Sequence, residues 1–246
     1  MKEILERCND CNEFSLSGAA DGYIVSKEEV TSAIAAKKEK NKQSLKNYYD
    51  KNNLNQNGYP EFDKLYSEIE KECKDFIAKE NRETSLNKLR KLYKEMGYSD
   101  EYIDLLFKNT FNCSSISDLV GKTTKYGKKN EGYFWNFYHN ISNIIDIENN
   151  KMKFCISNGK NPIEQIPNEL KKYLLRYEVS FYNEVTESSN LIINYYFALN
   201  NKTKEYLLKF KTEFDLTDLE DLAIYKGNIV KFYSCTHEKF NSYGQY

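Results

Sequence analysis

The spacing of apolar residues changes partway along this chain of 246 residues. Between residues 61 and 96, apolar side chains recur every three or four positions, a pattern that predicts amphipathic helices. After about residue 176, apolar and polar residues alternate, which is typical of half-buried strands. Helices followed by strands predict an α+β fold: a helical N-terminal region, then an antiparallel β-meander with one short helix.

This change of period divides the chain into three regions: a helical region over residues 1–110, an aromatic and basic connecting segment over 111–142, and an antiparallel sheet region over 143–246. Ser26 and Glu29 have capping-box spacing ahead of a long charged helix. Pro60 suits the first turn of a second helix, and Ser85 and Ser99 can cap two more. The residues expected in the helical core are Phe62, Leu65, Ile69, Phe76, Leu89 and Leu92.

The strands of the second half are less uniform. Residues 143–157 are predicted to form two strands around an asparagine-rich turn, and Pro167 precedes a short helix. Strands are predicted over 177–185 and 191–200. Residues 204–214 alternate as a strand does, and a strand is favoured there, although Leu207, Phe210 and Phe214 would also share one helical face.

The stretch "YKGNIVKFYSCTHEKF", residues 225–240, holds the most reactive side chains of the chain. Gly227-Asn228 predicts a two-residue hairpin turn, with Lys226 opposite Ile229, Tyr225 opposite Val230 and Ala223 opposite Phe232. If the second strand continues past that point, Cys235 and His237 lie on one face, about 6.6 Å apart.

That separation is too long for a thiol–imidazole hydrogen bond, so we interpret residues 235–238 as the end of a strand without catalytic function. Two ligands of one metal ion would tolerate it. Cys8 and Cys11 have a spacing common in zinc sites, so Cys8, Cys11, Cys235 and His237 together are an alternative metal site. The favoured interpretation has no metal and no cofactor.

The run "GKTTKYGKKN", residues 121–130, resembles a phosphate-binding loop only in part, because Ile116 stands where that motif needs its first glycine. Its lysines and the neighbouring aromatic residues could instead contact a partner protein. The candidate partner-binding residues are Lys122, Lys125, Tyr126, Lys128, Lys129, Tyr133 and Trp135. Trp135 could also fill the junction between the two halves of the chain.

The charge balance disfavours nucleic acid as a partner, because 36 basic residues are matched by 37 acidic ones. The charged N-terminus and the short apolar runs predict a cytoplasmic protein that does not enter a membrane, with its six cysteines as free thiols.

With so few chemical motifs, the sequence favours a non-enzymatic protein-binding protein, such as a toxin-neutralising immunity protein or a phage-encoded inhibitor. One alternative is a small enzyme, either a metal-dependent nuclease or a thiol-dependent hydrolase. A second alternative is a nucleic-acid-binding protein that uses the basic loop 121–130.

Overall fold

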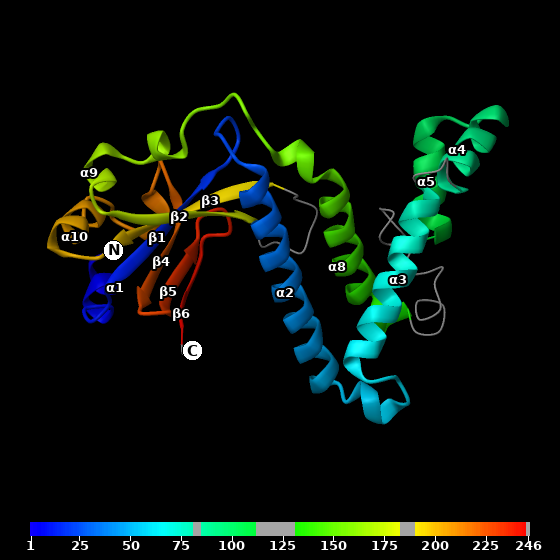
Figure 1. The fold of residues 1–246 in the computed structure, drawn as a ribbon, viewed down its shortest axis with the longest axis horizontal. Helices are drawn as coiled ribbons and strands as arrows, with labels where there is room; N and C mark the ends of the chain where they lie inside the picture. Colours follow the sequence, from blue (N-terminus) through cyan, green and yellow to red (C-terminus); the bar gives the residue numbers. More distant parts are fainter. Residues whose placement is uncertain (81–84, 112–130, 183–189, 245–246) are drawn as a thin grey trace. The chain divides into compact units, whose positions relative to one another are not determined.

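The computed structural model describes residues 1–80, 85–111, 131–182 and 190–244. The chain divides into two compact units, one formed by residues 1–34 together with 151–246 and the other by residues 35–150. The first unit contains the sheet, and the second is helical (Figure 1). The predicted α+β class is therefore confirmed.

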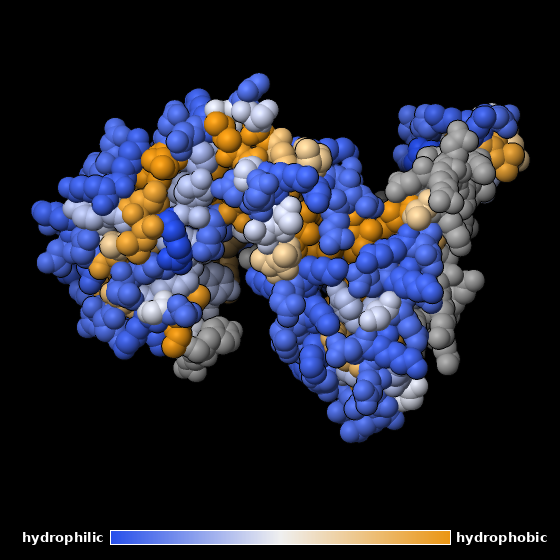
Figure 2. Space-filling view, in the orientation of Figure 1, coloured by the Kyte–Doolittle hydropathy of each residue, from blue (hydrophilic) through white to orange (hydrophobic). Residues whose placement is uncertain are grey.

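The helices expected in the first half of the sequence are present, with bounds α2 (Lys27–Lys51), α3 (Phe62–Glu80), α4 (Ser85–Glu95) and α5 (Asp100–Phe111), and a 3-10 turn η1 (Leu54–Asn57). The capping box ahead of α2 forms as predicted: the Glu29 N–H donates to Ser26 Oγ at 3.1 Å, and the Ser26 N–H donates to Glu29 Oε2 at 2.8 Å. Gly97, with φ of 88°, follows α4 in the left-handed conformation that commonly ends a helix. In Figure 2 the surface over α2 is mainly hydrophilic, and no helix among the described residues is both long and apolar enough to cross a membrane.

The core of the helical unit lies where α3 packs against α8 (Glu131–Asn150). Phe62, Leu65 and Ile69 are buried there, as predicted, and Phe76 packs partly buried against them. Leu92 is 49% exposed, so its placement in the core was wrong. Helical spacing identifies an apolar face but not what covers it. The side chain of Leu89 lies outside the described part of the chain.

The prediction of two strands over residues 143–157 was also wrong. Residues up to Asn150 continue α8, and a 3-10 turn, η2 (Lys151–Phe154), follows. Isoleucine favours strands intrinsically, but Ile141, Ile144 and Ile145 recur at helical spacing and are all buried. Burial of this face outweighs local propensity.

The described residues of the sheet unit form one six-stranded antiparallel sheet with the order β2-β3-β1-β4-β5-β6. The strands are β1 (Glu13–Ala19), β2 (Leu174–Phe181), β3 (Leu191–Ala198), β4 (Glu220–Lys226), β5 (Ile229–Cys235) and β6 (Phe240–Tyr243). The five later strands follow one another as neighbours except at one place. There β1, from the otherwise helical first region, lies between β3 and β4 and completes the sheet.

Short helical segments of the sheet unit contribute buried side chains to its core. They are α1 (Lys2–Arg7), η3 (Pro162–Gln165), α9 (Asn168–Lys171), α10 (Asn201–Leu207) and η4 (Glu213–Asp215). The short helix expected after Pro167 is α9. The strand favoured over residues 204–214 was wrong, because Asn200 caps α10: its side chain accepts hydrogen bonds from the N–H groups of Lys202 and Thr203.

The predicted β4–β5 hairpin forms around Gly227, whose φ of 58° suits the first central position of a type II′ turn. Lys226 pairs with Ile229 and Tyr225 with Val230, as expected. The register then shifts, so that Ile224 faces Phe232 and Ala223 faces Tyr233. The expected pairing of Ala223 with Phe232 was therefore wrong. The shift places Ile224 and Phe232, both fully buried, opposite each other.

Candidate functional site

One face of the sheet carries its apolar core and the other carries polar and aromatic side chains. Along β3 the residues alternate between buried and half-buried, as expected for a sheet with one wet face. The core face holds Phe14, Leu16, Ile193, Tyr195, Phe197, Leu222, Ile224 and Phe232. The opposite face, which we call the polar face, holds Glu13, Ser15, Ser17, Arg176, Glu178, Ser180, Asn194, Tyr196, Tyr225 and Tyr233.

Hydrogen bonds across the strands hold this polar face in place. The Ser17 hydroxyl donates to Asn194 Oδ1, and the Asn194 amide donates to Ser180 Oγ, each at 2.8 Å. These contacts join β1, β3 and β2 through side chains in addition to the backbone ladder. The polar face is therefore a rigid support, on which a bound group would meet preplaced donors and acceptors.

A cation and two aromatic rings lie together at one end of the polar face. Arg176 donates two hydrogen bonds to Glu13, at 2.9 and 3.1 Å, and its guanidinium lies 3.8 Å from the centre of the Tyr196 ring. Tyr196 in turn lies beside Tyr225, with ring centres 5.9 Å apart. Burial raises the pKa of both tyrosines, so both phenols are neutral at physiological pH and can donate hydrogen bonds.

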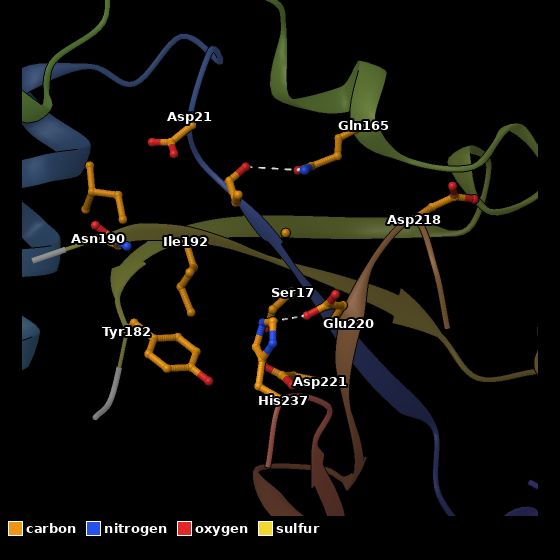
Figure 3. Close-up of a pocket in the computed structure, with 13 residues that line it drawn as sticks. Ser17, Asp21, Gln165, Tyr182, Asn190, Ile192, Asp218, Glu220, Asp221 and His237 are labelled. Atoms are coloured by element: carbon orange, nitrogen blue, oxygen red, sulfur yellow. Dashed lines mark hydrogen bonds and ion pairs between the residues drawn. The ribbon is translucent and has the colours of Figure 1, made fainter. Parts of the chain in front are cut away.

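Two adjoining hollows lie beside the polar face; the smaller is lined by residues of that face, and the larger extends past it to Gly18 and Gln165. The larger, of about 500 Å³, is lined by Ser17, Gly18, Ala19, Asp21, Gln165, Tyr182, Asn190, Leu191, Ile192, Asp218, Glu220, Asp221 and His237 (Figure 3). The smaller, of about 300 Å³, is lined by Ser15, Ser17, Ser180, Tyr182, Ile192, Asn194, Asp221, Ala223, Tyr225, Tyr233, Ser234, Cys235 and Glu238. Ser17, Tyr182, Ile192 and Asp221 line both, so the two hollows form one groove, which we call the sheet groove.

Asp221, one of the residues shared by both hollows, has a left-handed backbone with φ of 53°. It lies at a β-bulge, because Ser15 pairs with Ala223 while Ser17 pairs with Glu220, which leaves one extra residue in β4. Two hydrogen bonds hold it there: the Thr236 N–H donates to Asp221 Oδ1 at 2.7 Å, and the Asp221 N–H donates to Thr236 Oγ1 at 3.2 Å. Bulges of this kind re-aim side chains and are frequent beside functional sites.

His237 belongs to a turn and not to a strand. β5 ends at Cys235, and residues 236–239 connect it to β6, with φ of 48° at Lys239. His237 Nε2 lies 3.0 Å from Glu220 Oε2, as the dashed line in Figure 3 shows. Cys235 Sγ instead lies 3.5 Å from the Tyr182 hydroxyl. The expected extension of β5 through His237 was wrong, and the cysteine and histidine have different partners.

The lining of the sheet groove is acidic. Asp21, Asp218, Glu220, Asp221 and Glu238 contribute five carboxylates, and none of the described residues that line it is a lysine or an arginine. In Figure 3, Glu220 and Asp221 lie beside His237, whereas Asp21 and Asp218 lie apart from that group. The chain as a whole has almost equal numbers of acidic and basic residues, so the negative charge is concentrated locally.

Gln165 forms one wall of the larger hollow. Its Nε2 donates to the Ala19 carbonyl oxygen at 3.3 Å, and its Oε1 lies 2.9 Å from the Tyr195 hydroxyl. A Cβ at Gly18 would lie only 2.4 Å from Gln165 Oε1, so the glycine leaves room for this side chain.

The four side chains considered as metal ligands do not meet. Within the described ranges, no group of three or more histidine, cysteine, aspartate or glutamate residues is arranged to hold a metal ion. Cys8 and Cys11 are buried at the end of α1, where burial raises the pKa of Cys8 to about 12. Cys235 and His237 line the sheet groove instead.

The candidate partner-binding residues lie largely outside the described part of the chain. This holds for Lys122, Lys125, Tyr126, Lys128 and Lys129, and for the side chains of Tyr133 and Trp135, whose backbone belongs to α8. Sequence reasoning did not single out Ser17, Asp221 or Tyr182. The one local signal was a pair of acidic residues at the start of an apolar strand, Glu220 and Asp221, which is common on protein surfaces.

Comparison with known proteins found no match to this chain among family models, curated proteins or solved structures.

Proposed function

We propose that this chain is a cytoplasmic, non-enzymatic protein-binding protein that holds its partner against the polar face of its sheet. The observation that carries the proposal is the groove of two adjoining hollows, with Tyr182, Tyr225 and Tyr233 in its lining and Arg176 stacked on Tyr196 beside it. Tyrosine and arginine are enriched among the residues that dominate binding energy at protein interfaces.

The rigidity of the polar face supports the same function. Tyrosines on a hydrogen-bonded sheet lose little conformational freedom on binding, so more of the contact energy is available for affinity. The finer assignment, to a toxin-neutralising immunity protein or a phage-encoded inhibitor, rests on a sequence poor in catalytic motifs. Such an antagonist needs a preformed surface and no chemistry of its own.

A thiol-dependent hydrolase is a weaker candidate. The pair of His237 and Glu220 in a hollow favours it, because a carboxylate can orient a catalytic histidine. However, Cys235 contacts Tyr182, and a thiol nucleophile needs the histidine within hydrogen-bond reach. Nucleic acid is a poor occupant of the sheet groove, because five carboxylates would repel phosphate groups.

The proposal is tested by capture of partners from the native host with three baits: the wild-type chain, Tyr233→Ala and Tyr102→Ala. Both tyrosines are exposed, at 39% and 46%, but Tyr102 belongs to α5 in the helical unit and serves as the matched control. We expect one protein to co-purify with the wild type and with Tyr102→Ala and to be lost with Tyr233→Ala. If Tyr233 is a hot spot, its replacement by alanine should weaken the purified complex about 30-fold or more.

Partners that bind all three baits equally would overturn the proposal that the polar face is the binding surface. Turnover of a thioester or peptide substrate that disappears in Cys235→Ser would favour the hydrolase instead.

A further inference from the structure

The strongest asymmetry on the sheet unit is the charge of the sheet groove. Its lining contains five carboxylates and one histidine, and no lysine or arginine among the described residues. Lysines of this unit form ion pairs elsewhere, for example Lys226 with Asp10 and Lys202 with Glu205. Among the described residues, the lining itself therefore supplies no lysine or arginine to neutralise these carboxylates.

This charge restricts what can cover the groove. A partner that excludes water from Glu220 and Asp221 without supplying positive charge would bury ionised carboxylates, which is strongly unfavourable. A partner that places a cation there replaces the lost hydration by charge-assisted hydrogen bonds. An arginine is well suited, since its planar fork can bond a carboxylate with two N–H groups and can stack on aromatic rings such as those of Tyr182 and Tyr225.

The volume of the groove fits a long side chain. The larger hollow, of about 500 Å³, has room for a long side chain and part of the backbone that carries it. Neutral acceptors complete the lining, among them the side-chain oxygens of Asn190 and Ser17. The bulge at Asp221 places its carboxyl group in the lining of both hollows, so a cation in either one is close to it.

We propose that the sheet groove binds a basic protein segment, with an arginine or lysine side chain seated in the larger hollow beside Glu220 and Asp221. This inference rests on the proposed function and specifies the chemistry of the partner. Charge complementarity identifies the occupant: the groove is negative, rigid and edged with tyrosines, and a basic segment supplies the missing cations. Long-range attraction also speeds the encounter of the two proteins and makes it sensitive to salt.

The test uses a short probe of known chemistry. Nuclear magnetic resonance spectra of the full chain labelled with ¹⁵N are recorded with the amidated peptide Gly-Arg-Gly-Arg-Gly. The matched probe contains citrulline, the neutral isostere of arginine, in both arginine positions. We expect the arginine peptide to shift the backbone signals of Asp221, His237 and Tyr182, and the citrulline peptide to shift none of them.

Two variants isolate the charge of the groove from its shape. Asp221→Asn keeps an oxygen for the Thr236 N–H and a residue type that tolerates the left-handed backbone, and Glu220→Gln keeps an acceptor for His237. The control is Glu205→Gln on α10, which removes an exposed carboxylate away from the groove. The double variant of Asp221 and Glu220 should abolish the shifts, and the control should preserve them. Equal shifts with the citrulline peptide, or shifts that survive the double variant, refute a cation site.

The captured partner separates this inference from the proposed function. If the inference holds, the double variant weakens the purified complex about tenfold or more at low salt, and the difference shrinks as salt is raised. If the partner needs Tyr233 but its affinity changes neither in the double variant nor with salt, the proposed function stands and the inference that the partner contributes a basic segment is refuted. If the arginine peptide shifts the groove signals but the partner binds Tyr233→Ala as well as the wild type, the cation site stands and the proposed function is overturned.

Discussion

The left-handed backbone of Asp221 allows a sharp prediction about the stability of the sheet unit. Two contributions can be separated by substitution at this position. The first is the hydrogen bond from the Thr236 N–H to the carboxylate at 2.7 Å, which contributes about 1 kcal/mol. The second is the cost of φ at 53° for a residue with a Cβ, about 1–2 kcal/mol for alanine and close to zero for glycine.

These contributions predict an order of stability for four side chains at position 221. Asp221→Asn retains both the acceptor and the tolerance of the left-handed region, so its free energy of unfolding should lie within about 0.5 kcal/mol of the wild type. Asp221→Gly loses the hydrogen bond but still adopts the left-handed conformation without strain, so it should be destabilised by about 1 kcal/mol. Asp221→Ala loses both and should be destabilised by about 2–3 kcal/mol.

The measurement must report on the sheet unit itself. The single tryptophan of the chain lies in α8, so its fluorescence follows the helical unit and not the sheet unit. Hydrogen exchange in increasing urea, read by mass spectrometry on peptides from β4 and β5, gives the free energy of opening locally. Glu205→Ala, an exposed position on α10, controls for the loss of a carboxylate.

One result would refute the reasoning. If Asp221→Ala and Asp221→Gly are equally stable, the backbone at this position is not left-handed, and the bulge that places Asp221 in both hollows is not present. A loss of more than about 1 kcal/mol in Asp221→Asn would instead show that the negative charge itself stabilises the turn at residues 236–239.

Three further predictions concern the rest of the chain. Leu65→Ala, at a fully buried position of α3, should lower the free energy of unfolding of the helical unit by about 2–5 kcal/mol in urea denaturation followed by tryptophan fluorescence. Leu92→Ala, at a position that is 49% exposed, should change the same free energy by less than about 0.5 kcal/mol. Similar losses in both variants would contradict the packing of α3. Arg176→Lys cannot keep both the paired hydrogen bonds to Glu13 and the contact with the Tyr196 ring, so it should destabilise the sheet unit by about 1 kcal/mol, measured by hydrogen exchange. An unchanged free energy of opening would mean that the contact of Arg176 with the Tyr196 ring adds nothing to stability. Burial raises the pKa of Cys8 to about 12, so at pH 8 its thiolate is scarce and a thiol reagent should modify the half-buried Cys235 before Cys8. Mass spectrometry that finds Cys8 modified before Cys235 would show that α1 opens readily.

The sequence by itself determined the elements whose signals are local. The capping box of Ser26 and Glu29 starts α2, the three-and-four spacing of Phe62, Leu65 and Ile69 marks the buried face of α3, and Gly227 sets the β4–β5 turn. In each case the residues that decide the structure lie within a few positions of one another, so the backbone preference and the side-chain pattern can be read together.

The tertiary structure alone decided how those elements combine. β1 lies between β3 and β4 because residues 13–19 pair with strands that come at least 170 positions later, a contact that no local period encodes. α8 is a helix because its isoleucines are buried at helical spacing, against their own preference for strands.

The sheet groove is decided in the same way. Ser17 of β1, Gln165 of η3, Tyr182 after β2, Asp221 of β4 and His237 after β5 come from five separate segments. Each is an ordinary surface residue in its own stretch of sequence. They form a site only because sheet pairing brings the segments together and the bulge in β4 directs Asp221 into it, and pairing between distant strands is the information that a single sequence carries most weakly.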